Sequence, residues 1–325
     1  MIVRRPLVIL SERQRRLHKL RNVVQSALLV LGMLGILGLC AFFVWGWVGL
    51  VWAVVLTGAS LLLAPTIAPE WVMRAYGARP LEPADFPEGY GLLRRLAARA
   101  GLERLPRLYW LPTPILNAFA VGRPDRAAIG LSDGLLRTLT PRELAGVLAH
   151  ELSHVRNDDL WIMGLADVVS RLTSLLSWLG QLLLIFNLPF LLTGGVAVPW
   201  LVVLLLVFAP TLVGLLQLAL SRSREFDADL DAAALTGDPQ GLASALAKLE
   251  RFQGRFWEEI FMPGRRMPIP SLLRTHPPTE ERIRRLLDLY EPVEPPIEVP
   301  ERIVGPRSVR IASGPPRWHR TGVWY

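Results

Sequence analysis

The stretch from Thr140 to Asp159, TPRELAGVLAHELSHVRNDD, decides how the rest of the chain is read. Thr140 is a favourable helix N-cap, Pro141 suits the first helical position, and Glu143 lies three residues after the cap, which completes a capping box. Apolar residues then recur at three- and four-residue steps. The sequence therefore predicts a helix that begins at Pro141 and buries one face.

This helix carries the motif His-Glu-x-x-His, formed by His150, Glu151 and His154. Two imidazoles at i and i+4 stand one turn apart and can bind one zinc ion, while the glutamate can reach a water molecule on that metal. So short a motif also arises by chance, and then the two histidines are ordinary polar residues of an amphipathic helix. A second stretch, Ser221 to Asp229, favours the metal site because it supplies further ligands.

The second stretch reads SRSREFDAD and places Glu225 and Asp229 one helical turn apart. Glu225 can complete a His2Glu zinc site that leaves one position open for water. Asp229 can accept the other ring N–H of a ligating histidine and thereby fix its tautomer. The alternative for Glu225 is an exposed helical charge beside Arg222 and Arg224.

The composition indicates a membrane protein, because 51% of the 325 residues are hydrophobic and they gather in long blocks. The single cysteine, Cys40, excludes a disulfide within the chain and a cysteine zinc site. A net charge of +8 is compatible with nucleic acid, but the basic residues flank the apolar blocks and form no recognisable nucleic-acid module. The sequence therefore predicts contact with anionic lipid and no nucleic-acid partner.

The first apolar block follows a basic segment, residues 1–22, and is uncharged from Val23 to Pro69. A cleaved signal peptide has a shorter apolar core and a small-residue cleavage site, so this block is interpreted as an anchor. Two helices of about 20 residues fit into it, with a turn around Trp45 to Gly49. The predicted hairpin covers residues 23–68, and its basic flanks place both ends in the cytoplasm.

The second apolar block is uncharged from Leu172 to Leu220 and is interrupted near its middle by Asn, Pro and Gly residues. It is long enough for two more spans, and Arg171 and Arg222 at its ends favour a hairpin with both ends inside. Alternatively, this helical pair packs against the catalytic domain without spanning. The prediction is an α-helical membrane protein with four transmembrane helices in two hairpins and both termini in the cytoplasm.

The polar segments 69–171 and 221–290 predict an α+β domain, in which a small sheet precedes the metal helix. The expected strands are 107–111, 117–121 and 127–131, and the other expected helices are 90–100, 225–236, 239–252 and 277–290. The tail, residues 291–325, is rich in proline and arginine and is predicted to be extended or disordered.

Four stretches of the chain resemble, in order, motifs of the HtpX/Ste24 family of integral-membrane zinc metalloproteases, and the HtpX branch is the most similar. They are LNAFAVG at 116–122, HELSHVRNDD at 150–159, SRSREFDADLDAAALTGDP at 221–239 and THPPTEERI at 275–283. The resemblance extends from about Val23 to Leu289. Val121 stands where the family commonly has threonine, and the tail after Leu289 has no counterpart.

The resemblance implies a gluzincin-like catalytic domain facing the cytoplasm, with one zinc ion per chain and Glu151 as the base. The implied ligands are His150, His154 and Glu225. Asp159 matches an acidic residue that the family usually has five positions after the second histidine, and with Asp229 it is expected behind the ligands. The resemblance also implies that His276 and Arg282 are catalytic groups that stabilise the oxyanion. The alternative is a structural role for each: His276 at the start of the last helix, and Arg282 on its solvated face.

Substrate binding is expected at Asn117, Ala118, Phe119 and Ala120. In a strand, Asn117 and Phe119 share one face, and the two alanines leave the other face small. The resemblance implies that this segment is the sheet edge above the zinc, where an extended peptide adds a strand through main-chain hydrogen bonds. The alternative is an internal strand with Phe119 in the core.

The function predicted from the sequence is a zinc endopeptidase of a bacterial or archaeal cell membrane that hydrolyses misfolded or membrane proteins. The attacking water is activated by zinc and Glu151. The main alternative is a catalytically inactive, zinc-bearing scaffold or chaperone-like protein. A site-2-type intramembrane protease is disfavoured because charged residues surround the motif, and a transporter because both hairpins lack charge. The sequence leaves the oligomeric state open.

Overall fold

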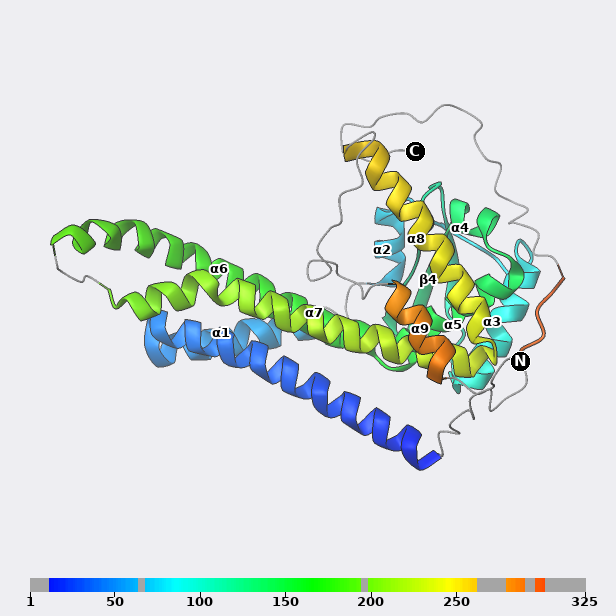
Figure 1. Cartoon of the computed structure of the whole chain (residues 1–325), viewed down its shortest axis with the longest axis horizontal. Coiled ribbons are helices and arrows are strands. Elements are labelled where there is room, and N and C mark those ends of the chain that lie inside the picture. The colour runs from blue at the N-terminus through cyan, green and yellow to red at the C-terminus, as the bar shows by residue number, and fades with distance from the viewer. Residues whose placement is uncertain (1–11, 64–67, 194–197, 262–278, 290–295, 302–325) are drawn as a thin grey trace, which may run out of the picture. The chain divides into compact units, whose positions relative to one another are not determined.

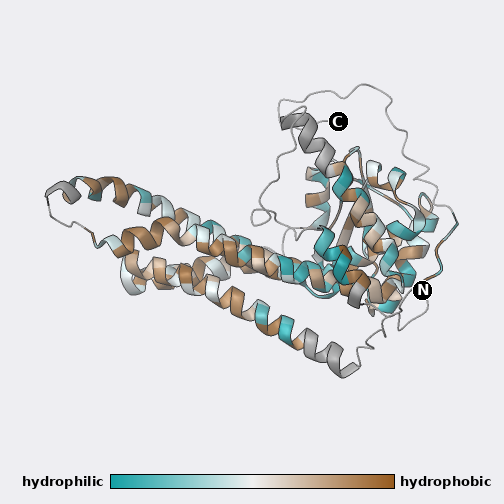
Figure 2. Cartoon of the chain, in the orientation of Figure 1, coloured by the Kyte–Doolittle hydropathy of each residue, from teal (hydrophilic) through white to brown (hydrophobic). Residues whose placement is uncertain are grey.

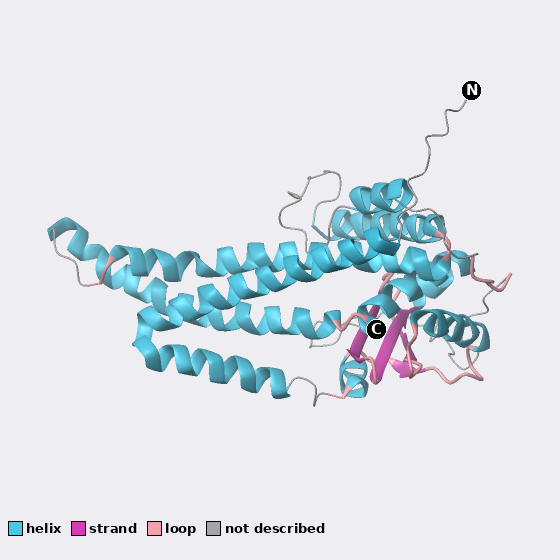
Figure 3. Cartoon of the chain, turned by 90° about the horizontal axis from the view of Figure 1, so that it is seen from below, coloured by secondary structure: helices cyan, strands magenta, loops and turns pink. Residues whose placement is uncertain are grey.

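The computed structural model describes residues 12–63, 68–193, 198–261, 279–289 and 296–301 (Figure 1). The chain divides into two compact units. The described residues within 11–66 and 161–224 form a helical unit, and those within 67–160 and 225–325 form an α/β unit. Figure 3 shows that all the strands belong to one small sheet and that the rest of the regular structure is helical.

The helical unit consists of α1 (Glu12–Leu63) and most of α6 (Asp159–Thr193) and α7 (Trp200–Thr236). Each of these helices is long and apolar enough to cross a membrane. Figure 2 shows their hydrophobic surfaces, and exposed tryptophans and leucines are frequent along them. A surface this apolar is stable in lipid rather than in water.

The first predicted hairpin lies within α1. Its backbone leaves the helical region at Trp45 and at Gly46, which has φ 59°. The chain folds back there and its two arms contact each other. A Cβ built on Gly38 would lie 3.2 Å from Leu50 Cδ1 of the other arm. The turn is where the sequence predicts it. Among the described residues there are three candidate membrane helices, and the whole of the bent helix α1 is one of them. The predicted number of four transmembrane helices is therefore not confirmed.

The second hairpin is formed by α6 and α7, which pack closely. A Cβ added to Gly180 would lie 2.4 Å from Leu206 Cβ, so the absence of a side chain lets the two helices approach. Near the connection, the Asn187 side-chain amide donates to the Val198 carbonyl oxygen at 2.8 Å and accepts from its N–H at 3.2 Å. The helices extend beyond the predicted block 172–220, since α6 begins at Asp159 and α7 continues to Thr236.

The sheet of the α/β unit has the strand order β1-β2-β4-β3. The strands are β1 (Arg79–Pro80), β2 (Arg107–Leu111), β3 (Ala118–Arg123) and β4 (Arg126–Ser132). β2 and β4 are parallel, whereas β1 and β3 pair antiparallel to their neighbours. β3 is therefore an edge strand, and one row of its backbone groups is not used by the sheet.

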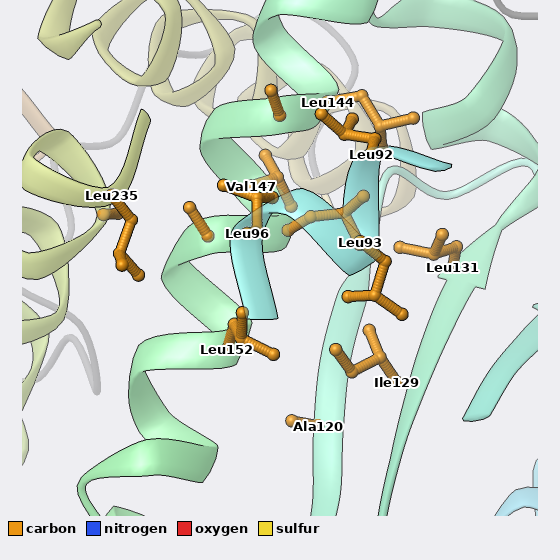
Figure 4. Packing of buried hydrophobic residues seen from close by; sticks show 14 of the residues in the cluster. Leu92, Leu93, Leu96, Ala120, Ile129, Leu131, Leu144, Val147, Leu152 and Leu235 are labelled. Carbon is orange, nitrogen blue, oxygen red and sulfur yellow. The ribbon is translucent and has the colours of Figure 1, made fainter. Parts of the chain in front are cut away.

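Six helices complete the α/β unit together with the end of α7. They are α2 (Pro69–Ala75), α3 (Pro87–Ala100), α4 (Asp133–Thr138), α5 (Pro141–Arg156), α8 (Pro239–Phe261) and α9 (Thr279–Leu289). Figure 4 shows leucines and a valine of α3 and α5 packed against Ala120, Ile129 and Leu131 of the sheet. A smaller cluster around Met73 of α2 covers the opposite face.

The metal helix α5 begins as the sequence predicts. The Thr140 side chain accepts from the Glu143 N–H, and the Glu143 carboxylate accepts from the Thr140 N–H at 2.8 Å. Glu143 is buried and also binds Lys248 at 2.7 Å and Ser244 at 2.6 Å, both on α8. The capping group therefore also fastens α8 to the start of α5.

Some elements differ from those predicted. β1, α2 and α4 are not predicted, because segments of two to seven residues show too little periodicity. In the tail, which was predicted to be extended or disordered, the described residues 296–301 pack against the α/β unit. Ile297 is buried, and its N–H donates to the Thr236 carbonyl oxygen at 2.8 Å.

Candidate metal centre

Three predicted ligands converge in the α/β unit. His150 and His154 come from α5 and Glu225 from α7, and their ligand atoms all lie within 4.8 Å of one another. The two Nε2 atoms are 3.2 Å apart, and the Glu225 carboxylate lies 3.4 Å from His150 Nε2 and 3.9 Å from His154 Nε2. Among the described residues, this is the one cluster with the geometry of a metal site.

Each histidine has a carboxylate at its other ring nitrogen. Asp229 Oδ1 lies 3.0 Å from His150 Nδ1, and Asp159 Oδ2 lies 2.9 Å from His154 Nδ1. Both aspartates are buried. An anion at Nδ1 favours the tautomer with its proton on that nitrogen, which leaves Nε2 with a lone pair for a metal. The arrangement thus directs both Nε2 atoms to the same point.

Arg282 of α9 lies behind the carboxylates. Its Nε and Nη2 bind the two oxygens of Asp229 at 2.7 and 2.6 Å, and its Nη1 lies 3.1 Å from Glu225 Oε2. The guanidinium is buried rather than on a solvated helix face. It therefore fixes the side chains of Glu225 and Asp229 on α7. The predicted catalytic residue His276 lies outside the described residues.

The charges around His150 favour a cation. Burial on its own lowers the pKa of His150, but hydrogen bonds and charge interactions with Asp229 and Glu225 outweigh it and raise the pKa to about 10. Burial likewise raises the pKa of Asp229, yet Arg282 and His150 hold it below its ordinary value. A divalent cation supplies the positive charge that these carboxylates stabilise. The donor set of two imidazoles and one carboxylate suits zinc.

Glu151 lies next to the ligands on the sheet side of α5. Its carboxylate lies near the Ala120 N–H of β3, a strand that packs against α5. Burial raises the pKa of Glu151, and the imidazoles of His150 and His154 lower it only in part. A carboxylate with a raised pKa accepts a proton more readily near neutral pH, as a general base must.

The predicted substrate segment forms the start of the edge strand. The Asn117 carbonyl accepts from the Ser132 N–H at 3.0 Å, so residue 117 and its alternate neighbours direct their backbone groups toward β4. Ala118 and Ala120 therefore direct theirs away from the sheet. Because β3 packs against α5 and the Ala120 N–H lies near the Glu151 carboxylate, this free edge borders the metal helix.

Residues 86–290 match the family model described as Peptidase family M48. The chain belongs to this family. A protein named Protease HtpX homolog from Desulfatibacillum aliphaticivorans is 32% identical over 283 residues, covering 82% of this chain and 89% of the relative. One of the same name from Acaryochloris marina is 38% identical over 259 residues, covering 76% and 87%. The predicted resemblance to the HtpX/Ste24 family is thereby confirmed.

Among solved structures, that of S. mikatae Ste24p has a TM-score of 0.49 and 21% identity, and it covers 83% of this chain and 66% of that one. M48 membership and the three candidate membrane helices together make the chain a membrane-associated metallopeptidase.

The structure of this M48 chain also shows a positioning residue that the sequence analysis missed. Asp231 of α7 accepts from Ser153 at 3.1 Å and from the Asn157 side chain at 2.9 Å, and it pairs with Arg156. These three residues lie at the end of α5, so Asp231 fastens that end to α7. A signal was present, because Arg156 and Asn157 follow the motif directly and Asp231 lies two residues after Asp229.

Proposed function

We propose that the chain is a zinc-dependent endopeptidase. The observation that carries this proposal is the convergence of His150, His154 and Glu225 beside Glu151 in an M48 chain. The three ligands would hold one zinc ion, with Asp159 and Asp229 orienting the two imidazoles. Bound zinc supplies a Lewis acid that polarises the substrate carbonyl and lowers the pKa of water.

Glu151 accepts a proton from the water that attacks the peptide carbonyl and then passes it to the leaving amine. Its carboxylate lies near the Ala120 N–H, beside the sheet edge. His276 and Arg282 stay our candidates for stabilising the oxyanion. For Arg282, the ion pairs with Asp229 and Glu225 support a second role, which is to orient the acidic side chains.

The substrate is proposed to bind as an added strand along β3. Main-chain hydrogen bonds to Ala118 and Ala120 would hold it next to Glu151, with Asn117 and Phe119 at the same segment. Such binding recognises the backbone, so we propose that extended or unfolded segments of misfolded and membrane proteins are cleaved with loose sequence preference. The catalytic domain and both termini are proposed to be cytoplasmic, next to anionic lipid, because the basic residues flank the apolar blocks.

The test compares purified full-length protein with Glu151→Gln and measures zinc content and degradation of a misfolded membrane protein. Gln keeps the shape of the side chain but is not basic, so zinc content should stay the same and proteolysis should be lost. Loss of zinc together with activity would count against the role of Glu151 as the base. A wild type that binds zinc but degrades nothing would favour an inactive scaffold instead. In a second variant, Glu225→Ala, zinc content should fall.

A further inference from the structure

An aromatic pair borders the edge strand on the face opposite the metal helix. Tyr76 follows the last residue of α2, is 61% exposed and lies with its ring centroid 5.0 Å from that of Phe119. The phenylalanine ring is only partly buried. Exposed aromatic rings in contact form an apolar surface that water solvates poorly.

The two faces of β3 pack against different helices, so side chains of an added strand would contact different residues on each face. Ala118 and Ala120 belong to the face that packs with α3 and α5. Phe119 and Val121 belong to the other face, which packs around Met73 of α2. Pro69 lies at Gly122, and Tyr76 lies at Phe119, so α2 runs along β3 on that face. The chain then leaves for β1 at the opposite edge of the sheet.

A peptide added to the free edge of β3 would present its side chains alternately to these two faces. A side chain on the α2 face, beside Phe119, would meet the rings of Phe119 and Tyr76. Its two neighbours in sequence would point toward α5 instead. Phe119 adjoins Ala120 in the strand, and Ala120 is the residue of β3 whose N–H lies near the carboxylate of Glu151 on the adjacent helix α5.

We propose that Tyr76 and Phe119 form a specificity subsite that takes a large apolar or aromatic side chain of the substrate near the scissile bond. This inference rests on the proposed function and adds the class of side chain that this site selects. Within the described part of the chain the Tyr76 hydroxyl makes no hydrogen bond, and the residue stays 61% exposed despite its contact with Phe119.

The experiment uses the purified full-length protein with zinc and peptides varied one position at a time among Ala, Leu, Phe and Lys around the cleaved bond. At one position the wild type should prefer Phe and Leu over Ala and Lys. In Tyr76→Ala, kcat/KM for the Phe and Leu peptides should fall about 3- to 10-fold, as expected for one aromatic contact. The kcat/KM for the Ala peptide should change less than twofold.

Two matched variants separate specificity from folding. Tyr76→Phe should keep the preference, because the ring is retained. Trp71→Ala removes an aromatic residue of α2 that is 72% exposed and should leave every ratio unchanged. The inference is overturned if Tyr76→Ala leaves the ratio of kcat/KM between the Phe peptide and the Ala peptide unchanged, or if kcat/KM falls equally for all peptides. Either result leaves the proposed function intact. The proposed function itself fails if Glu151→Gln cleaves these peptides as fast as the wild type.

Discussion

At the scale of single residues, the two histidines are each held by a different aspartate. Asp159 contacts His154 within the stretch that joins α5 to α6, whereas Asp229 contacts both His150 and Arg282. Removing either aspartate frees one imidazole to rotate, but removing Asp229 also leaves a buried guanidinium without its main partner. Asp229 is therefore expected to affect both metal binding and stability.

For Asp159→Ala we expect zinc affinity to fall roughly 10- to 100-fold, because the imidazole of His154 loses its orienting carboxylate. The measurement is competition with a chromogenic zinc chelator. Asp133→Ala is the matched control, since that half-buried carboxylate accepts from Arg137 and Trp110, lies outside the metal cluster and should leave the affinity unchanged. Equal affinities in wild type and Asp159→Ala would return Asp159 to a purely structural role.

For Asp229→Ala we expect the same loss of zinc affinity together with a lower Tm, because breaking a buried ion pair typically costs about 3–5 kcal/mol. The double variant Asp229→Ala with Arg282→Met removes the unpaired charge as well. It should recover most of the Tm but none of the zinc affinity. Recovery of both would show that Asp229 acts only through protein stability.

At the scale of the helices, the start of α5 depends on a titratable group. Burial raises the pKa of Glu143, but hydrogen bonds from Lys248, Ser244 and Thr140 outweigh it and lower the pKa below its ordinary value of 4.5. A lowered pKa in the folded state means that the carboxylate stabilises the fold above pH 4.5. This stabilisation is lost as the pH falls through the lower, folded-state value.

We therefore expect Glu143→Gln to lower the free energy of unfolding by about 1–3 kcal/mol at pH 7 and to reduce its dependence on pH in acid. Thermal unfolding at a series of pH values measures both. Glu281→Gln, which removes an exposed ion pair with Arg285, should change neither by more than about 0.5 kcal/mol. Parallel pH curves for wild type and Glu143→Gln would contradict the assignment.

The close approach of α5 and α8 gives a second prediction at this scale. A Cβ at Gly146 would lie 2.8 Å from Leu242 Cα, so Gly146→Ala forces two backbones apart and should cost about 1–3 kcal/mol. Gly91→Ala in α3 is the control, because a Cβ there meets nothing within 4 Å. It should leave the Tm unchanged or raise it, since alanine favours helix. A lower Tm in both variants would contradict the packing argument.

The sequence predicted the elements whose signals are local. The start of α5 followed from its capping box, and strand 107–111 followed from its turn signals and matches β2. The helix α2 was not predicted, although it places Tyr76 beside β3, because seven residues contain too little periodicity. The contacts of Arg282 and Asp231 could not be predicted either, because each depends on how α7 lies against another helix.

At the scale of the whole molecule, the proposed topology places both ends of each hairpin in the cytoplasm. Cysteines introduced at the exposed positions Arg79 and Arg171, which flank the two hairpins, should then react with a membrane-impermeant reagent only after cells are opened. The native Cys40 is buried and should give little background. Cysteine at Trp47, beside the turn of α1, is the matched control and should be labelled from outside. Labelling at Arg79 in intact cells would overturn this arrangement.

The metal ligands are divided along the chain by the second hairpin, since His150 and His154 precede α6 while Glu225 follows most of α7. During synthesis, the two histidines leave the ribosome well before the third ligand exists. A nascent chain thus carries an incomplete metal site until α6 and α7 have both been made. In the proposed enzyme, a chain that ends before Glu225 would lack the third ligand and would not hydrolyse peptides.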